Sequence, residues 1–443
     1  MSGGRLEHSF GSHGTHLQRR RAADCPGYLT WSHEWRLSVQ ELRCCQRTCK
    51  LPPVSELQAA QRVHPLVRLA PTRLSPPEAQ RRRKGTLAGS VREDLEKEIA
   101  RLPVFDTHEH LPRESEFLAG NVDAFRFVGH YLRADLVAAG MSVQDAYRTL
   151  QDPALSLEER WELLQPYWPL VKHGRYARAT RLALRELFGV EDLNLETLRR
   201  VTEELQRRAR PGYYRQILTE RGNIRRVLNF VEPWFEAVQD PDPAFLLPVP
   251  TLFEPVMIRS KGDVQRLESK FDVDLSSFDR YLAFLEAAVE RYTQLGARAL
   301  KFNLAYARSL RFGRPTRSEA EAAFNALFRH YGEGISQATA VPLQDYAVRR
   351  LVGLAGERDL PVVFHTGFQN DQAHFLEHAR ATHLTDLFLD FPRVRFVLLH
   401  ADFPWVEETL LLSKMFTNVW QSLAWLYILS EEVSRRALRF CLD

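Results

Sequence analysis

The chain has 443 residues, of which 44% are hydrophobic and 26% charged, an ordinary composition for a globular protein with a sizeable core. No stretch approaches the roughly 20 uncharged apolar residues that a membrane helix needs. Residues 1–10 are polar and lack the apolar stretch of a secretory signal. These features argue against membrane, secreted and fibrous classes, and they predict a cytoplasmic protein that does not act at a membrane.

Residues 1–90 form a basic segment that differs from the rest of the chain. They contain 15 Lys and Arg against 6 Asp and Glu, whereas the remainder is net acidic. No apolar period persists in this segment, so we interpret it as a disordered or non-native basic extension, with an organelle transit peptide as the alternative. Nucleic-acid binding by the extension is a further hypothesis. The acidic body carries no such signal, and we expect no nucleic-acid partner.

The ordered part is predicted to begin with a charged helix over residues 92–102, followed by a strand over 104–106 that turns abruptly polar. Residues 111–223 then show apolar positions at three- and four-residue spacing. A segment of this length is too long for a loop and is predicted to be a helical insertion after strand 1. Its clearest helices are expected at residues 155–168, 176–187 and 195–210.

After the insertion, apolar strand-like runs alternate with helical patterns up to the end of the sequence. This alternation predicts a parallel sheet covered by helices. With the first strand, seven strands are expected in residues 91–443, which predicts an α/β protein with an incomplete (β/α)8 TIM-like barrel whose last strand is missing. The later strands are expected at residues 226–231, 245–252, 297–303, 361–366, 395–400 and 418–423, and helices at 275–294, 343–357 and 406–415.

Histidines follow three of the predicted strands directly. His108 and His110 follow the first strand, His365 the fifth and His400 the sixth. The carboxyl ends of barrel strands open on one face, where active sites are assembled. Side chains alternate along a strand, so positions 108 and 110 point to the same side. Because neutral imidazole is a preferred ligand of zinc and similar divalent ions, the pattern predicts a metal site at this face, most simply for zinc.

Three further residues are candidates for a role at this site. Lys301 ends the fourth strand; it could be carbamylated to bridge two metals or bind an anionic substrate, and the alternative is a lysine that extends to the barrel rim. Tyr176 and Arg178 lie in the helical insertion, from which they could close over the site and bind substrate.

Four motifs together resemble the amidohydrolase superfamily, in its amidohydrolase-related branch that includes decarboxylases and uronate-isomerase-like proteins. They are FDTHEH at residues 105–110, LKFNLAY at 300–306, VFHTG at 363–367 and VLLHADFPW at 397–405. The resemblance implies that His108, His110 and His365 are metal ligands and that His400 is a further ligand or an acid–base group. The family's aspartate at the end of strand eight has no counterpart before residue 443, so we expect a C-terminally truncated copy.

The residues and the resemblance together predict a metal-dependent hydrolase of the amidohydrolase type. A metal-activated water would attack a small polar, anionic substrate, with His400 assisting proton transfer and Lys301 holding a carboxylate. The alternatives are a metal-dependent nonoxidative decarboxylase of the same fold, and an inactive truncated fragment that serves only in binding. The expected partner is a small-molecule substrate, and homo-oligomerisation is left open.

Overall fold

The structure, a computed structural model, describes residues 87–442 apart from 121, 130, 241, 330–333 and 372. The predicted basic extension lies outside the described residues up to residue 86. Helix α3 (Leu87–Arg101) begins within the last residues assigned to that extension, so the helix starts earlier than expected. No helix in this part of the chain is both long and apolar enough to cross a membrane.

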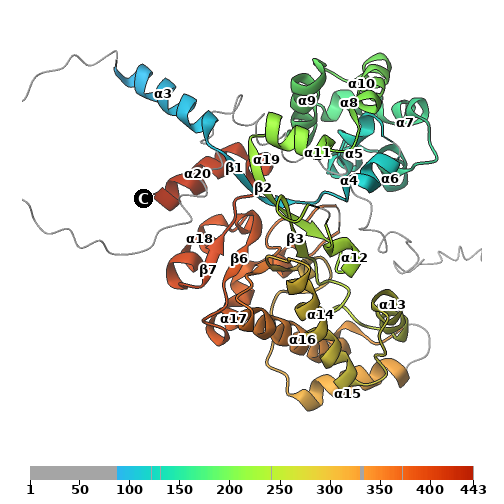
Figure 1. Cartoon of the computed structure of the whole chain (residues 1–443), viewed down its shortest axis with the longest axis vertical. Helices are drawn as coiled ribbons and strands as arrows, with labels where there is room; N and C mark the ends of the chain where they lie inside the picture. Colours follow the sequence, from blue (N-terminus) through green and yellow to red (C-terminus); the bar gives the residue numbers. More distant parts are fainter. Residues whose placement is uncertain are drawn as a thin grey trace, which may run out of the picture. The chain divides into compact units, whose positions relative to one another are not determined.

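The strands between residues 87 and 442 form two parallel sheets, in the orders β1-β2-β3 and β4-β5-β6-β7. A bridge between Thr251 and Lys301 joins β3 to β4, so the seven strands follow one another in chain order. The predicted parallel α/β architecture is confirmed (Figure 1), and no pairing of β7 with β1 closes a barrel among the described strands. The strands are β1 (Val104–Glu109), β2 (Ile224–Val231), β3 (Leu246–Pro250), β4 (Leu300–Phe302), β5 (Val362–Phe364), β6 (Phe396–Leu398) and β7 (Val419–Gln421).

Side-chain alternation along the short strands separates an outer core from an inner layer. In β4, Leu300 and Phe302 belong to the large core shared with the covering helices, whereas Lys301 between them points the other way. The inner layer is a small apolar cluster contributed by successive strands. Its buried members are Phe230, Val249, Ala299, Val363 and Leu399.

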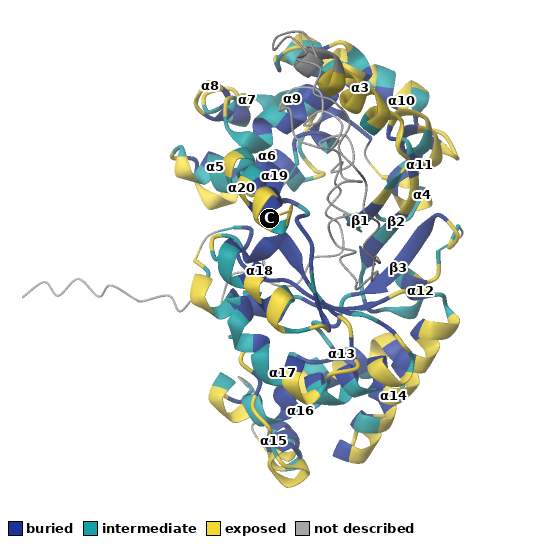
Figure 2. Ribbon diagram, turned by 90° about the vertical axis from the view of Figure 1, so that its left-hand side faces the viewer, coloured by how far each residue is buried: buried dark blue, intermediate teal, exposed yellow. Residues whose placement is uncertain are grey.

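The helices between β2 and β6 pack around the large core and expose their polar faces (Figure 2), whereas the helices after β6 share a smaller apolar cluster. Among them, α14 and α15 both contact α16, and α18 contacts β7. The helices in this region are α12 (Phe235–Val238), α13 (Lys261–Phe271), α14 (Phe278–Gln294), α15 (Arg317–Arg329), α16 (Gln337–Glu357), α17 (Thr385–Asp390), α18 (Val406–Met415), α19 (Leu426–Leu429) and α20 (Glu431–Leu442). Short helical turns are η5 (Leu304–Tyr306), η6 (Leu376–Ala379), η7 (Ala381–Leu384) and η8 (Leu399–Asp402).

The segment between β1 and β2 is helical, as predicted, and has an apolar core of its own. Ser156 caps α7 in a reciprocal capping box with Glu159, and Gly189 ends α9 in the left-handed conformation. Its elements are α4 (Glu114–Ala119), η3 (Ala124–Arg126), α5 (Leu132–Ala138), α6 (Val143–Gln151), α7 (Leu157–Leu164), α8 (Trp168–Val171), α9 (Arg175–Phe188), α10 (Leu195–Arg208), α11 (Tyr213–Arg215) and the π-helical turn η4 (Gln216–Arg221).

Candidate functional site

Four imidazoles from three strands lie together at the carboxyl ends of the strands. The ring centres of His108 and His110, both at the end of β1, are 5.0 Å apart. The ring of His108 lies 5.1 Å from that of His400, which follows β6, and His400 lies 4.8 Å from His365, which follows β5. The structure therefore brings together the histidines that the sequence singled out.

Lys301 is buried beside these imidazoles. Its side chain comes from the inner face of β4, and the residue is 2% exposed. The ammonium nitrogen lies 4.8 Å from the ring centre of Phe230, and it has no hydrogen-bond partner among the described residues. The same Phe230 ring packs against His108 and His110, at 4.5 and 5.6 Å. A lysine extending to the rim is thus not what the structure shows.

Burial and mutual repulsion keep this group of bases uncharged. Burial lowers the pKa of His400 to about 3, with a further contribution from Lys301. Burial and the neighbouring bases also hold the pKa of His108 and of His365 well below the ordinary value. The pKa of the Lys301 ammonium is lowered well below its usual range by burial. At neutral pH the imidazoles of His108, His365 and His400 are therefore neutral, the form in which histidine binds metal ions.

A left-handed turn directs His400 into the site. Residues 400–402 all have positive φ angles, between 47° and 63°, directly after β6. His400 Nδ1 lies 2.9 Å from the carbonyl oxygen of Ala424, which fixes the ring against the loop after β7. Gly367 (φ 71°) packs so closely on this turn that a Cβ would lie 2.4 Å from the carbonyl carbon of Asp402. The glycine is therefore required for the loops after β5 and β6 to meet.

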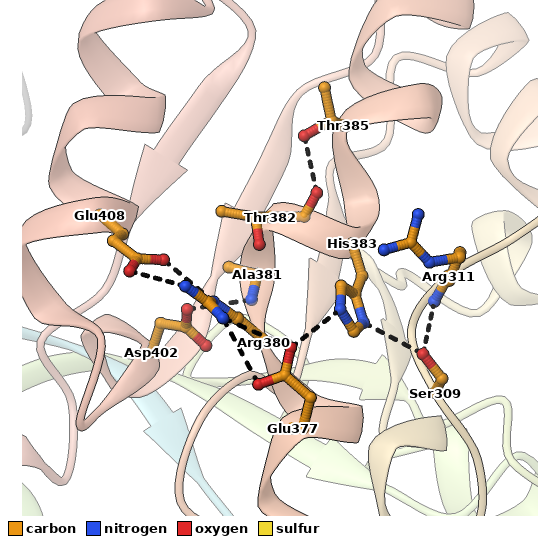
Figure 3. A network of polar contacts seen from close by, with 10 residues as sticks. All are labelled: Ser309, Arg311, Glu377, Arg380, Ala381, Thr382, His383, Thr385, Asp402 and Glu408. Carbon is orange, nitrogen blue, oxygen red and sulfur yellow. Dashed lines mark hydrogen bonds and ion pairs between the residues drawn. The ribbon is translucent and has the colours of Figure 1, made fainter.

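A polar network behind the site joins the loops after β4, β5 and β6 (Figure 3). Arg380 makes a bidentate ion pair with Glu408, at 2.8 and 3.0 Å. His383 lies 3.0 Å from the hydroxyl oxygen of Ser309. The backbone N–H of Ala381 donates to the buried carboxylate of Asp402, at 2.9 Å. These contacts hold the loops that carry His365 and His400 in one arrangement.

Trp425 covers the imidazoles, a contact that the sequence analysis missed. It follows β7 closely, has φ 70°, and lies with its ring centre 4.9 Å from that of His400. Tyr131 and Tyr176 of the insertion stack on each other, and the Tyr176 ring centre is 6.5 Å from Trp425. Tyr176 thus reaches the site through Trp425. The sequence signal that could have identified Trp425 is its position just after the strand predicted at residues 418–423.

Arg178 lies on α9, two residues after Tyr176. It lines a surface pocket of the insertion with Lys172, Arg181 and Arg185. Residues two apart on a helix are rotated by about 200°, so Arg178 and Tyr176 face different sides of α9. Tyr176 faces Trp425, and the expectation that Arg178 also closes over the site stays a prediction.

The side chains at the strand ends fit a divalent metal ion in their chemistry. Neutral imidazole nitrogen is the preferred ligand class, and Nδ1 of His108 is buried with no hydrogen-bond partner among the described residues. Leaving such an atom unpaired costs about 1–3 kcal/mol, which a ligand would relieve. Among the described residues, no three His, Cys, Asp or Glu side chains are already arranged as a coordination set.

Comparison with known proteins agrees with this architecture. Residues 272–440 match the family model described as amidohydrolase. Protein fluG of Emericella nidulans is 28% identical over 130 residues, an alignment that covers 26% of this chain. The chain spans only 15% of the length of fluG.

Several solved structures share the fold at low sequence identity. Uronate isomerase from Thermotoga maritima superposes with a TM-score of 0.59 and 17% identity, over 72% of this chain and 75% of the isomerase. Glucuronate isomerase from Caulobacter crescentus gives 0.52 and 17%, over 72% and 73% of the two chains. A protein from Lactobacillus casei assigned as a metal-dependent hydrolase gives 0.51 and 14%, over 77% and 79%. The family match over residues 272–440 supports the resemblance to the amidohydrolase-related superfamily that the sequence motifs predict, and the solved structures show that the fold is shared.

Proposed function

We propose that this protein is a metal-dependent hydrolase of the amidohydrolase type that acts on a small, polar, anionic substrate. The observation that carries the proposal is the convergence of four imidazoles and one buried lysine at the strand ends. A purely structural role explains this cluster poorly, because burying the Lys301 amine and His108 Nδ1 without hydrogen-bond partners among the described residues is unfavourable. The chemistry of these side chains suits a centre that receives a cation and an anionic ligand.

His108, His110 and His365 are the proposed metal ligands, and zinc is the proposed ion. A divalent ion held there would polarise a scissile carbonyl and lower the pKa of a bound water toward about 7. The Nε2 atom of His365 lies 3.1 Å from the carbonyl oxygen of Phe368, so its Nδ1 is the nitrogen left for other contacts. The contacts of Phe230 with both imidazoles of β1 would restrict their ring orientations.

His400 is the proposed acid–base group. If its Nδ1–H donates to the carbonyl oxygen of Ala424, its Nε2 carries a lone pair toward the other imidazoles. That nitrogen can accept a proton during attack and return it to the leaving group. The left-handed turn at residues 400–402 and the Ala424 contact both fix the orientation of the ring, as proton transfer requires.

Lys301 is the proposed binding group for a substrate carboxylate. Its amine is buried beside the imidazoles and has no hydrogen-bond partner among the described residues. An anionic substrate would supply the missing negative charge and favour the ammonium form. Trp425 and Tyr176 would form the apolar wall on the opposite side of the substrate. Arg178, on the same helix as Tyr176, is a further proposed binding group for the substrate.

The test is turnover by the zinc-loaded full chain on a panel of N-acyl amino acids, lactones, aromatic carboxylic acids and hexuronates. Hydrolysis of amides or lactones that is lost in His400→Asn, with zinc retained, would support the proposal. His378→Asn is the matched control, because His378 lies in η6 and contacts Phe375. Carbon dioxide release alone indicates a decarboxylase, and isomerised hexuronate alone indicates an isomerase. Either result, or no turnover by folded, zinc-loaded protein, would refute hydrolysis.

A further inference from the structure

The segment over residues 368–371, which follows β5, borders the imidazoles. The carbonyl oxygen of Phe368 lies 3.1 Å from His365 Nε2. The ring of the same phenylalanine lies 5.6 Å from Trp425, which covers the imidazoles. The segment therefore contacts both a histidine of the proposed substrate site and the indole above it.

Two buried amide residues of this segment, Gln369 and Asn370, are bonded to the loop after β4. Gln369 Nε2 donates to the carbonyl oxygen of Ala305 at 2.6 Å, and the backbone N–H of Asn370 donates to the hydroxyl oxygen of Tyr306 at 3.3 Å. The Tyr306 ring itself lies 4.7 Å from His365. The two amide residues are only 4% and 5% exposed. They are thus held in place beside the proposed substrate site.

The amide oxygens of these side chains are buried acceptors without a donor. Gln369 Oε1 and Asn370 Oδ1 have no hydrogen-bond partner in the part of the chain that the structure describes, and the same holds for Oδ1 of Asn303, two residues after Lys301. For Gln369 the contact with Ala305 fixes which end is which, because a carbonyl oxygen cannot donate and the amide nitrogen must face it. A buried acceptor that lacks a donor is unfavourable and uncommon in folded proteins.

Two other buried amides of this chain are bonded at both ends. Gln421 Nε2 donates to the carbonyl oxygen of Thr409 at 2.6 Å, and its Oε1 accepts from the hydroxyl of the same threonine at 3.1 Å. Asn229 bonds in the same way to the N–H and the C=O of Leu111. Gln369 makes the same 2.6 Å bond through its nitrogen but leaves its oxygen without a protein donor. Packing alone therefore does not explain an amide at position 369.

We propose that Gln369 and Asn370 determine specificity by accepting hydrogen bonds from the substrate, an inference that rests on the proposed substrate site. The substrate then carries a hydroxyl or amino group in addition to the carboxylate that Lys301 binds. Both groups are hydrogen-bond donors, which is the property that an amide oxygen recognises. An analogue without the donor is rejected, because it leaves the buried oxygens of the site unpaired. Asn303 is the third acceptor available to the same substituent.

The test is a set of dissociation constants for the metal-free full chain, measured by ligand-observed NMR titration. The probes are hexanoate, its 3- and 6-hydroxy and 3- and 6-amino derivatives, and the methyl ethers of the two hydroxy acids. The ethers keep the oxygen but cannot donate a hydrogen bond. We expect at least one donor-bearing acid to bind about ten-fold or more tightly than hexanoate and than the ethers. Whether the hydroxy or the amino acid binds better identifies the donor.

Gln369→Met should abolish this preference, lowering the affinity for the donor-bearing acid about ten-fold while leaving that for hexanoate unchanged. Gln421→Met is the matched control, because it removes an equivalent 2.6 Å bond to a backbone carbonyl away from the segment, and it should keep the preference. If Gln369→Met does not fold, Asn370→Leu takes its place with the same expected loss.

Three results would overturn the proposal: no preference for a donor-bearing acid in the wild type, an undiminished preference in the variant of the segment, or an equal loss in Gln421→Met. The outcome is separable from that of the hydrolytic proposal. A donor preference that depends on Gln369, in a protein without turnover, would count against hydrolysis only. Turnover without any donor preference would count against this specificity subsite only.

Discussion

Gly367→Ala should destabilise the protein more than an ordinary glycine substitution in the same backbone conformation. Gly367 has φ 71°, and a Cβ there would lie 2.4 Å from the carbonyl carbon of Asp402 and 2.6 Å from the nitrogen of Phe403. A left-handed alanine costs about 1–2 kcal/mol. The forced displacement of the Asp402–Phe403 backbone adds about 1–3 kcal/mol, as in other overpacked interiors. The expected loss of unfolding free energy is therefore about 2–5 kcal/mol.

Gly189→Ala is the matched control for this prediction. Gly189 has φ 65° and no atom within 4 Å of the Cβ position, so only the conformational cost of about 1–2 kcal/mol applies. Urea unfolding of the full chain, followed by far-ultraviolet circular dichroism, gives both values. If the two variants lose the same stability, then Gly367 is not held against the turn that carries His400, and the argument for the arrangement of these loops is refuted.

Three further changes test other parts of the structure. Burial raises the pKa of Glu232 to about 8, above the ordinary 4.5, so its ionisation opposes folding as pH rises between these values. Glu232→Gln should therefore add up to about 3 kcal/mol to the free energy of unfolding at pH 8 and little at pH 4.5. Equal effects at both pH values would contradict this. Asn229→Ala removes the side chain that bonds to both the N–H and the C=O of Leu111, each at 2.7 Å, and should cost about 2–4 kcal/mol in urea unfolding. Asp345→Ala breaks a buried ion pair with Arg308 (2.6 Å) and should cost about 3–5 kcal/mol, whereas a loss below 1 kcal/mol would show that the pair is solvated.

The sequence located the strand ends well because apolar runs that turn polar mark them directly. His365 and His400 follow β5 and β6 as predicted, and a parallel sheet necessarily gathers these ends at one edge. Helix α18 (Val406–Met415) has the predicted bounds. Helix α16 begins earlier than predicted, at Gln337 rather than at residue 343, because Pro342 lies inside the helix instead of marking its start.

What the sequence could not provide were contacts that depend on backbone turns and on helix rotation. Trp425 reaches His400 through a residue with positive φ, which periodicity in the sequence does not reveal. The contact of Tyr176 with Trp425 depends in the same way on the rotation of α9, which the sequence pattern does not give. The burial of Lys301 depends on which face of β4 its side chain occupies. A strand of three residues is too short for its sequence pattern to show this.

The most direct test of the central claim is the metal content of the full chain, measured by elemental analysis after loading with zinc and dialysis. The wild type should retain at least one equivalent of zinc, and His108→Ala/His110→Ala should lose it while keeping its circular dichroism. His378→Ala should retain the metal, since that imidazole lies outside the cluster. Folded wild-type protein without zinc, or equal zinc in the double variant, would contradict a metal centre at these imidazoles.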